Sequence, residues 1–194
     1  DSVLKLLHEP LSGTRFRRNS IQRSLDWILE RAGQDGDAAT DGLGAIFPPM
    51  VYLQVVLMAQ GYSREHPVVR RAEEELDDFF IEDSPERIRI QPCFSPVWDT
   101  GIALYALADC GYTAADEAAA RAAAWLRSKE CRFQGDWIRN VRGSVPFTGW
   151  YFEYHNAWYP DCDDTAMVGK ALHRIGGEEN LAASGRALDW MLAM

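Results

Sequence analysis

Apolar positions recur along this chain at the spacing of helix faces, and three segments repeat one pattern without gaps. In each segment an apolar stretch ends at a glycine, and an arginine follows ten residues later. The glycines are Gly61, Gly111 and Gly176, and the arginines are Arg71, Arg121 and Arg186. Because only glycine enters the left-handed region cheaply, each glycine fits the end of a helix. The repeat predicts antiparallel helix pairs joined by short turns.

The position four residues beyond each arginine also repeats. Trp125 and Trp190 occupy it in two copies, Glu75 occupies it in another, and Trp27 lies in a fourth copy of the second half. We expect Trp125 and Trp190 to be core residues. Residues 116–130 consist mainly of strong helix formers. The predicted fold class is all-α, and the stacked helix pairs form either an open solenoid or a closed ring, between which the period does not decide.

Two segments interrupt the helical pattern. Residues 33–47 are rich in glycine and aspartate, and residues 131–159 mix glycine and proline with aromatic residues, so both are predicted loops. The last repeat, residues 186–194, stops where its counterpart in an earlier copy continues into a turn at residues 134–137. This ending indicates that the chain is a fragment of a longer protein.

Composition narrows the classes of function. The net charge is −9 and 47% of the residues are hydrophobic. This composition suffices for a core but offers no basic surplus, so we expect no nucleic-acid partner. The four cysteines lack the spacing of a zinc site and indicate free thiols in a reducing cytosolic setting. They are Cys93, Cys110, Cys131 and Cys162.

The apolar content is not concentrated in a membrane span. No apolar run in the sequence approaches the length of about 18 residues that a spanning helix needs. Apolar residues near the N-terminus are either core residues or contacts to a membrane interface. They are Val3, Leu4, Leu6, Leu7 and Leu11.

Three carboxylates, Asp161, Asp163 and Asp164, gather within four residues at the start of a predicted helix. Aspartates there commonly cap free amides. Asp164 is followed by threonine, and so is Asp99 at the same position of another copy of the repeat. Asp164 is therefore the predicted cap. Neighbouring carboxylates cannot all ionise cheaply, so we expect one to hold a proton near neutral pH and to serve as a general acid. A divalent metal held by Asp161 and Asp164 is the alternative interpretation.

Aromatic residues crowd the segment beside these carboxylates. Between Trp150 and Tyr159, six of ten residues are aromatic. If this segment is extended, Trp150, Phe152 and Tyr154 share one face. Aromatic faces stabilise cations by about 0.5 to 2 kcal/mol each, and Trp98 offers a further face. The pattern favours an acid that generates a carbocation next to walls that stabilise it.

Four ordered blocks of this sequence resemble the central region of bacterial squalene–hopene cyclases, which are class II triterpene cyclases. The blocks are residues 95–112, 135–140, 149–168 and 186–194. The resemblance implies two α/α barrels, or toroids, each closed into a double-layered ring. Residues 1–94 would be the C-terminal part of one barrel, and residues 95–194 would be the beginning of the second, which carries the acid motif.

The resemblance also implies the chemistry. In this family the acid motif protonates a terminal alkene of squalene and starts a cationic polycyclisation to hopene or hopanol, without metal or cofactor. Asp163 would be the proton donor, with Asp161 and Asp164 tuning it, and the acid's histidine partner would lie outside this chain. The residues that would line the cavity and its entrance are Trp98, Phe152, Phe47 and Pro48, and some members of the family have glutamine at the position of Phe47.

The expected setting follows from the same resemblance. The longer protein would act in hopanoid biosynthesis as a peripheral protein on the cytoplasmic face of the bacterial membrane, and a homodimer is compatible with this role. We expect the fragment alone to be inactive. Two alternatives remain: a class II cyclase of another prenyl substrate, and a non-catalytic helical-repeat binding module in which the aspartates only cap a helix.

Overall fold

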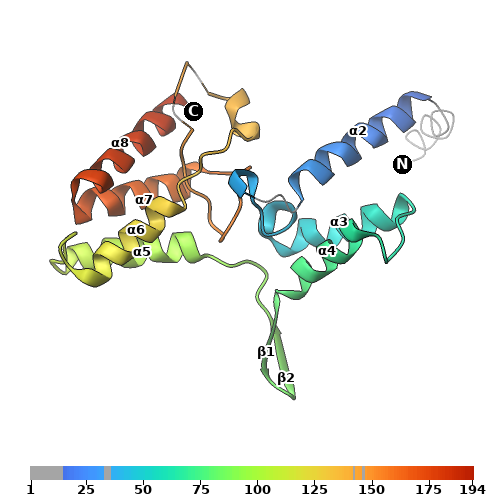
Figure 1. Cartoon of the computed structure of the whole chain (residues 1–194), viewed down its shortest axis with the longest axis horizontal. Helices are drawn as coiled ribbons and strands as arrows, with labels where there is room; N and C mark the ends of the chain where they lie inside the picture. The colour runs from blue at the N-terminus through green and yellow to red at the C-terminus, as the bar shows by residue number, and fades with distance from the viewer. Residues whose placement is uncertain (1–14, 33–35, 142, 146) are drawn as a thin grey trace, which may run out of the picture.

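A computed structural model describes residues 15–32, 36–141, 143–145 and 147–194. Figure 1 shows the helices in two groups, α2 to α4 and α5 to α8, joined by loops. Among the helices of these described residues, none combines the length and the apolarity that crossing a membrane requires. The N-terminal residues for which we predicted a core or interfacial position, Val3 to Leu11, lie outside the described residues.

The helices form the predicted antiparallel pairs. The pairs are α3 (Phe47–Ala59) with α4 (Pro67–Asp77), α5 (Pro96–Asp109) with α6 (Glu117–Ser128), and α7 (Cys162–Ile175) with α8 (Glu178–Ala193). Helix α2 (Arg15–Arg31) contains Trp27, where the sequence predicted the second half of a fourth copy. Helix α7 packs on both α5 and α8. The prediction of an all-α fold built from repeated helix pairs, as in part of an α/α toroid, is confirmed.

The turns between paired helices follow the predicted glycines. Gly61 and Gly111 have φ angles of 83° and 92°, in the left-handed region. The next backbone N–H in each case reaches back to a leucine carbonyl, from Tyr62 to Leu57 and from Tyr112 to Leu107, both at 3.1 Å. Gly176, with φ of 77°, takes the cap position of α7 itself. The repeated glycines therefore end helices for the reason the sequence indicated.

Each helix group has its own hydrophobic cluster. Leu53, Leu57 and Val69 belong to the cluster of α2 to α4, and the cluster of α5 to α8 includes Leu104, Leu126 and Leu172. Trp190 is fully buried, which confirms its predicted core position. Trp125 is only half-buried and packs at the edge of the second cluster, with the Lys129 ammonium over its ring.

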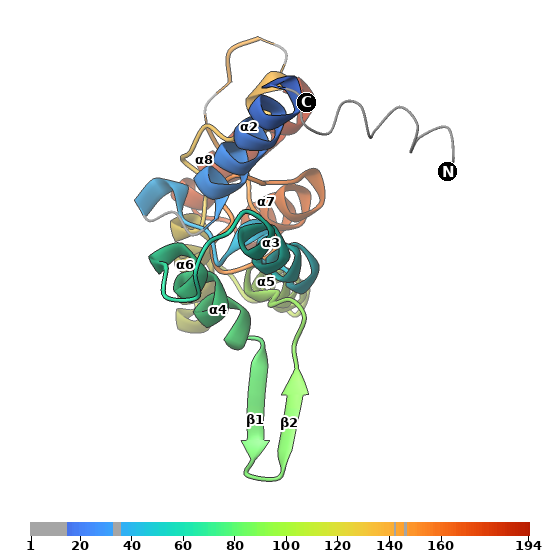
Figure 2. The ribbon, with the colours of Figure 1, turned by 90° about the vertical axis from the view of Figure 1, so that its right-hand side faces the viewer.

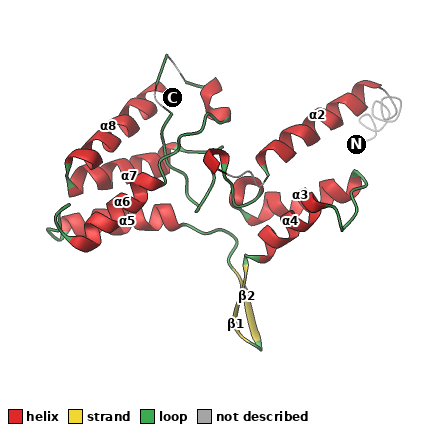
Figure 3. Cartoon of the chain, in the orientation of Figure 1, coloured by secondary structure: helices red, strands yellow, loops and turns green. Residues whose placement is uncertain are grey.

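A β-hairpin interrupts the helical chain between α4 and α5 and was not predicted. Strand β1 (Phe80–Ser84) pairs antiparallel with β2 (Arg87–Ile90), and the hairpin projects away from the helices (Figures 2 and 3). Asp83 forms ion pairs with Arg87 and Arg89 across it. Because Phe80, Ile88 and Ile90 stay exposed in the described residues, the hairpin adds little to either cluster.

The predicted loops hold the two groups together. Residues 33–47 contain short 3-10 turns at Gly36–Ala38 and Leu43–Ala45, and residues 131–159 contain one at Asp136–Arg139. Arg31, at the end of α2, is only 3% exposed and lies between the rings of Trp27 and Trp158, at 4.2 and 4.1 Å. Its guanidinium donates two hydrogen bonds of 2.7 Å to Asp136. This buried contact ties α2 to the loop that follows α6.

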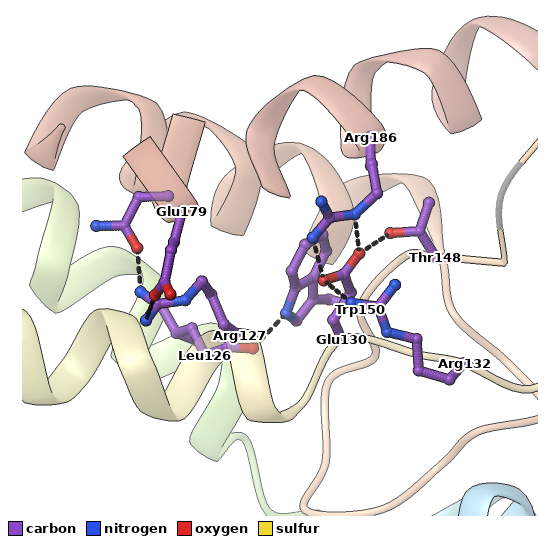
Figure 4. A network of polar contacts seen from close by, with 9 residues as sticks. Leu126, Arg127, Glu130, Arg132, Thr148, Trp150, Glu179 and Arg186 are labelled. Atoms are coloured by element: carbon purple, nitrogen blue, oxygen red, sulfur yellow. Dashed lines mark hydrogen bonds and ion pairs between the residues drawn. The ribbon is translucent and has the colours of Figure 1, made fainter. Parts of the chain in front are cut away.

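A second buried ion pair organises α6 and α8 (Figure 4). The carboxylate of Glu130 accepts two hydrogen bonds of 2.7 Å from Arg186 and one each from Arg132 and Thr148. Trp150 lies beside this network and donates its indole N–H to the Leu126 carbonyl at 2.7 Å. Arg186, which the repeat singled out, therefore anchors the last described helix to the loop that leads to the acidic residues.

Candidate active site: an acid cluster beside aromatic rings

The first turn of α7 is clamped to the loop that precedes it. Asp161 and Trp150 form an isolated β-bridge, in which the Asp161 N–H donates to the Trp150 carbonyl at 3.0 Å. The Trp150 N–H donates in turn to the Thr165 hydroxyl at 2.9 Å. Gly149 makes this approach possible, because its φ is 115° and a Cβ there would meet the Cβ of Pro160 at 2.9 Å. Both ends of the segment from Trp150 to Asp161 are thereby held beside the acid cluster. We define the acid cluster as Asp161, Asp163 and Asp164.

Within the acid cluster the capping residue is Asp161. Helix α7 begins at Cys162, and the Asp161 carboxylate accepts a 2.8 Å hydrogen bond from the backbone N–H of Asp164. The prediction that Asp164 is the cap is therefore wrong. The physical reason is position: Asp164 is already the third helical residue, so its N–H is one of the free donors that a cap must satisfy.

Asp164 is instead the buried acid of the cluster. It is 3% exposed, and its Oδ1 atom has no hydrogen-bond partner among the described residues. Burial raises the pKa of Asp164 to about 8, helped by a hydrogen bond that its side chain shares with Asp161 and by the charges of Asp161, Glu153 and Asp163. Asp164 thus holds a proton near neutral pH, in agreement with the expectation that one member of the cluster does so.

A pocket of about 360 Å³ opens beside the acid cluster. Its lining consists of Trp98, Phe152, Asp161, Asp163 and Asp164. The rings of Trp98 and Phe152 lie 6.4 Å apart, with an angle of 34° between their planes. The Val97 N–H donates to the Phe152 carbonyl at 3.3 Å and so joins the start of α5 to this wall. The structure therefore brings together five of the seven predicted site residues.

The other two predicted residues lie elsewhere. Phe47 and Pro48 form the first turn of α3, and neither lines this pocket in the part of the chain that the structure describes. The ring of Phe47 packs instead against Phe79, with ring centroids 6.4 Å apart. Their expected place at a cavity entrance stays a prediction.

The condition for a shared face of the aromatic run, an extended segment, is not met. Residues 152–154 form a bend, so the segment is not a regular strand. The ring of Trp150 is fully buried in the cluster of α5 to α8, whereas Phe152 faces Trp98 and Tyr154 lies near Phe94. Only one of these three aromatic rings therefore joins the pocket.

The acid cluster does not resemble a metal site. Among the described residues there is no group of three or more His, Cys, Asp or Glu side chains arranged to hold a metal ion. One oxygen of Asp161 is committed to capping α7. The four cysteines are free thiols, as predicted.

One acidic residue near the pocket was missed at the sequence level. Glu153 follows Phe152 in the bend and is only 6% exposed. Burial raises its pKa to about 7, and the charges of Asp161 and Asp41 contribute. The signal available in the sequence was a lone carboxylate inside an aromatic run, eight residues before Asp161.

Two family models match this chain. The model described as the squalene–hopene cyclase C-terminal domain matches residues 94–194, and the model of the N-terminal domain matches residues 1–85. The first of these matches contains the whole acid cluster and both rings of the pocket.

Curated relatives cover nearly all of the chain. It is 32% identical to a squalene–hopene cyclase of Zymomonas mobilis, over 98% of this chain and 30% of the relative. It is 36% identical to a squalene–hopene cyclase of Bradyrhizobium diazoefficiens, over 97% of this chain and 28% of the relative. It is also 36% identical to a dammaradiene synthase of Dryopteris crassirhizoma, over 100% of this chain and 28% of the relative. The chain therefore spans less than a third of the length of these relatives.

Proposed function

The chain belongs to the squalene–hopene cyclase family, and from this premise we propose that the longer protein carrying it protonates squalene and cyclises it to hopene or hopanol. The observation that supports this proposal is the pocket, in which a carboxyl group that stays neutral near pH 7 lies beside two aromatic rings. Protonated acid and cation-stabilising wall are the two parts that this reaction needs.

The first step is a proton transfer from the acid cluster to the terminal alkene. The π electrons of the alkene form the new C–H bond, a tertiary carbocation remains on the substrate, and a carboxylate remains on the protein. We assign the donor role to Asp163, which is exposed toward the pocket. Asp164, one residue further along, holds the proton that passes to Asp163 and replaces the one given to the alkene, and the Asp164 carboxylate then takes up a proton from water. Asp161 tunes the cluster, because its carboxylate accepts hydrogen bonds inside it.

The rings of Trp98 and Phe152 stabilise the cation that follows. Each offers a quadrupole worth about 0.5 to 2 kcal/mol to a cation at its face. Neither aromatic ring is nucleophilic enough to trap the cation readily. The positive charge therefore passes along the substrate as its rings close. Loss of a proton from the last cation gives hopene, and capture of water gives hopanol.

Replacing Asp163 tests the assignment. In the full-length protein, Asp163→Asn is expected to abolish squalene conversion, measured by gas chromatography of the products. Asp116→Asn is a matched control, because Asp116 also lies before a helix start, outside the pocket. Normal conversion by the Asp163 variant would refute the donor role, and loss of activity only in Asp164→Asn would move that role to Asp164. Conversion that stops when a chelator is added would favour the metal-dependent alternative.

A different prenyl substrate is the second candidate. The Dryopteris relative carries the name of a dammaradiene synthase, so the family includes proteins with differently named products. Product analysis with squalene and with a C20 prenyl diphosphate separates the two. A helical-repeat binding module is a third candidate, and Asp164 titrating at the ordinary value for an aspartate in the full-length protein would favour it.

The remaining parts of the proposal concern the longer protein. We propose that residues 1–94 and 95–194 belong to two barrels, and that Phe47 and Pro48 lie at the entrance of the cavity between them. We also propose peripheral contact with the cytoplasmic face of a bacterial membrane, a homodimeric assembly, and an inactive isolated fragment. Vesicle flotation, analytical ultracentrifugation and an activity assay of the 194-residue chain test these points.

A further inference from the structure

The chain contains two buried glutamates with opposite surroundings. Glu130 is 5% exposed and contacts two arginines, as Figure 4 shows. Glu153 is 6% exposed, and no ion pair to it occurs in the described part of the chain. Buried carboxylates are normally paired with a cation, because an isolated buried charge is costly. Glu130 therefore has a structural explanation, and Glu153 needs another.

The recorded contacts of the Glu153 carboxylate bring no positive charge to it. The Asn156 side-chain amide donates to one carboxylate oxygen at 3.1 Å, and the Cys93 sulfur lies 4.0 Å from the other. Two buried oxygens nearby have no hydrogen-bond partner among the described residues: Oδ1 of Asn156 and Oδ1 of Asp164. Buried acceptors left without donors are uncommon and call for an explanation such as a bound proton or water.

The charges that face Glu153 are all acidic or neutral. Among the described residues they come from helix α7 and its cap, with Asp164 and Asp161, from the preceding loops, with Asp41 and Cys93, and from Tyr151 in its own segment. The charge of Glu153 is one of the causes that raise the pKa of Asp164. The two carboxyls thus oppose each other's ionisation, as neighbouring acids do.

We propose that Glu153 is a positioning residue of the acid cluster, whose buried carboxylate holds the exchangeable proton on the Asp161–Asp164 pair. It directly follows Phe152, which lines the pocket together with Asp161 and Asp164. After the acid has given its proton to the substrate, the negative charge of Glu153 favours the uptake of a new proton by the cluster. The effect of Glu153 on the proton affinity of the cluster does not depend on the proposed cyclase function. Only its benefit to catalytic turnover rests on that function.

Glu153→Gln tests the role, because glutamine keeps an oxygen for the Asn156 amide and removes only the charge. Infrared difference spectroscopy of the full-length protein follows the protonated carboxyl band of Asp164, identified by its loss in Asp164→Asn. We expect the titration midpoint of Asp164 to fall by about one pH unit, because the like charge of Glu153 is among those that raise the pKa of Asp164. The alkaline limb of squalene conversion should move by the same amount.

Two controls separate charge from packing. Glu153→Asp keeps the charge and is expected to keep the midpoint near the wild-type value. Glu75→Gln removes a half-buried carboxylate whose charge is not among those acting on Asp164, so it should change nothing. An unchanged midpoint in Glu153→Gln, or an equal shift in Glu153→Asp, would overturn the proposal.

The test remains decisive in two further cases. If Glu153→Gln does not fold, linkage requires Asp164→Asn to lower the titration midpoint of Glu153, and an unchanged Glu153 midpoint refutes the coupling. If the midpoint shifts but the wild-type protein converts no squalene, the proposed function fails while the role of Glu153 in holding the proton stands.

Discussion

Replacement of Arg186 by methionine should destabilise this chain far more than the same change at another copy of the repeat. The Glu130 side chain is 1% exposed, and both of its oxygens accept 2.7 Å hydrogen bonds from Arg186. Removing one partner of a buried ion pair typically costs about 3 to 5 kcal/mol, because the other charge stays buried. Since Arg132 and Thr148 still contact Glu130, we expect a loss of about 3 kcal/mol, at the lower end of that range.

Urea unfolding followed by tryptophan fluorescence measures this difference. Arg121→Met is the matched control, because Arg121 occupies the same repeat position but forms only an exposed ion pair with Glu117 on its own helix. Its expected effect is below about 0.5 kcal/mol. The double variant Glu130→Leu/Arg186→Met leaves no buried carboxylate at this position and should recover much of the lost stability. Equal losses in Arg186→Met and Arg121→Met would refute the reasoning that burial makes the Arg186 pair important.

Two further predictions concern the acid cluster. Gly149→Ala should lower the melting temperature more than Gly111→Ala. Both positions have left-handed φ angles, but only a Cβ added at Gly149 would meet another atom, the Cβ of Pro160 at 2.9 Å. Equal shifts in melting temperature would mean that backbone strain alone matters. Asp164→Asn should remove one pH dependence of the free energy of unfolding. Because the pKa of Asp164 is raised in the folded state, the contribution of Asp164 to this free energy falls as pH rises from about 4 to about 8. Urea unfolding at a series of pH values checks this, and parallel wild-type and variant profiles would contradict it.

Features that depend on local sequence were predictable. The turns at Gly61 and Gly111 follow from the conformational freedom of glycine, and the helix pairs follow from the period of the repeat. The neighbourhood of Trp98, Phe152 and the acid cluster was predicted as well, because the family resemblance orders those residues around one cavity. The roles of these residues in catalysis stay predictions.

Features that depend on distant partners could not be derived in the same way. Nothing local distinguishes Arg186, which binds buried Glu130, from Arg121, which does not, since their partners lie on different elements. The capping role of Asp161 depends on where α7 begins, and a shift of a few residues in that start changes which aspartate caps it. The hairpin was not predicted, and although Arg87, Ile88, Arg89 and Ile90 alternate as in a strand, the apolar positions stay exposed and give no buried face that would mark one.

The clamp between Trp150 and the start of α7 has a stereochemical consequence. The Trp150 backbone bonds to the Asp161 N–H and to the Thr165 hydroxyl hold the start of α7, and the Val97 N–H bond to the Phe152 carbonyl holds the segment that carries one ring of the pocket. For the proposed reaction, an alkene lying against both rings would offer only one of its two faces to the acid. The face of the alkene that receives the proton would then be set by these few hydrogen bonds, before any later part of the cavity shapes the rings.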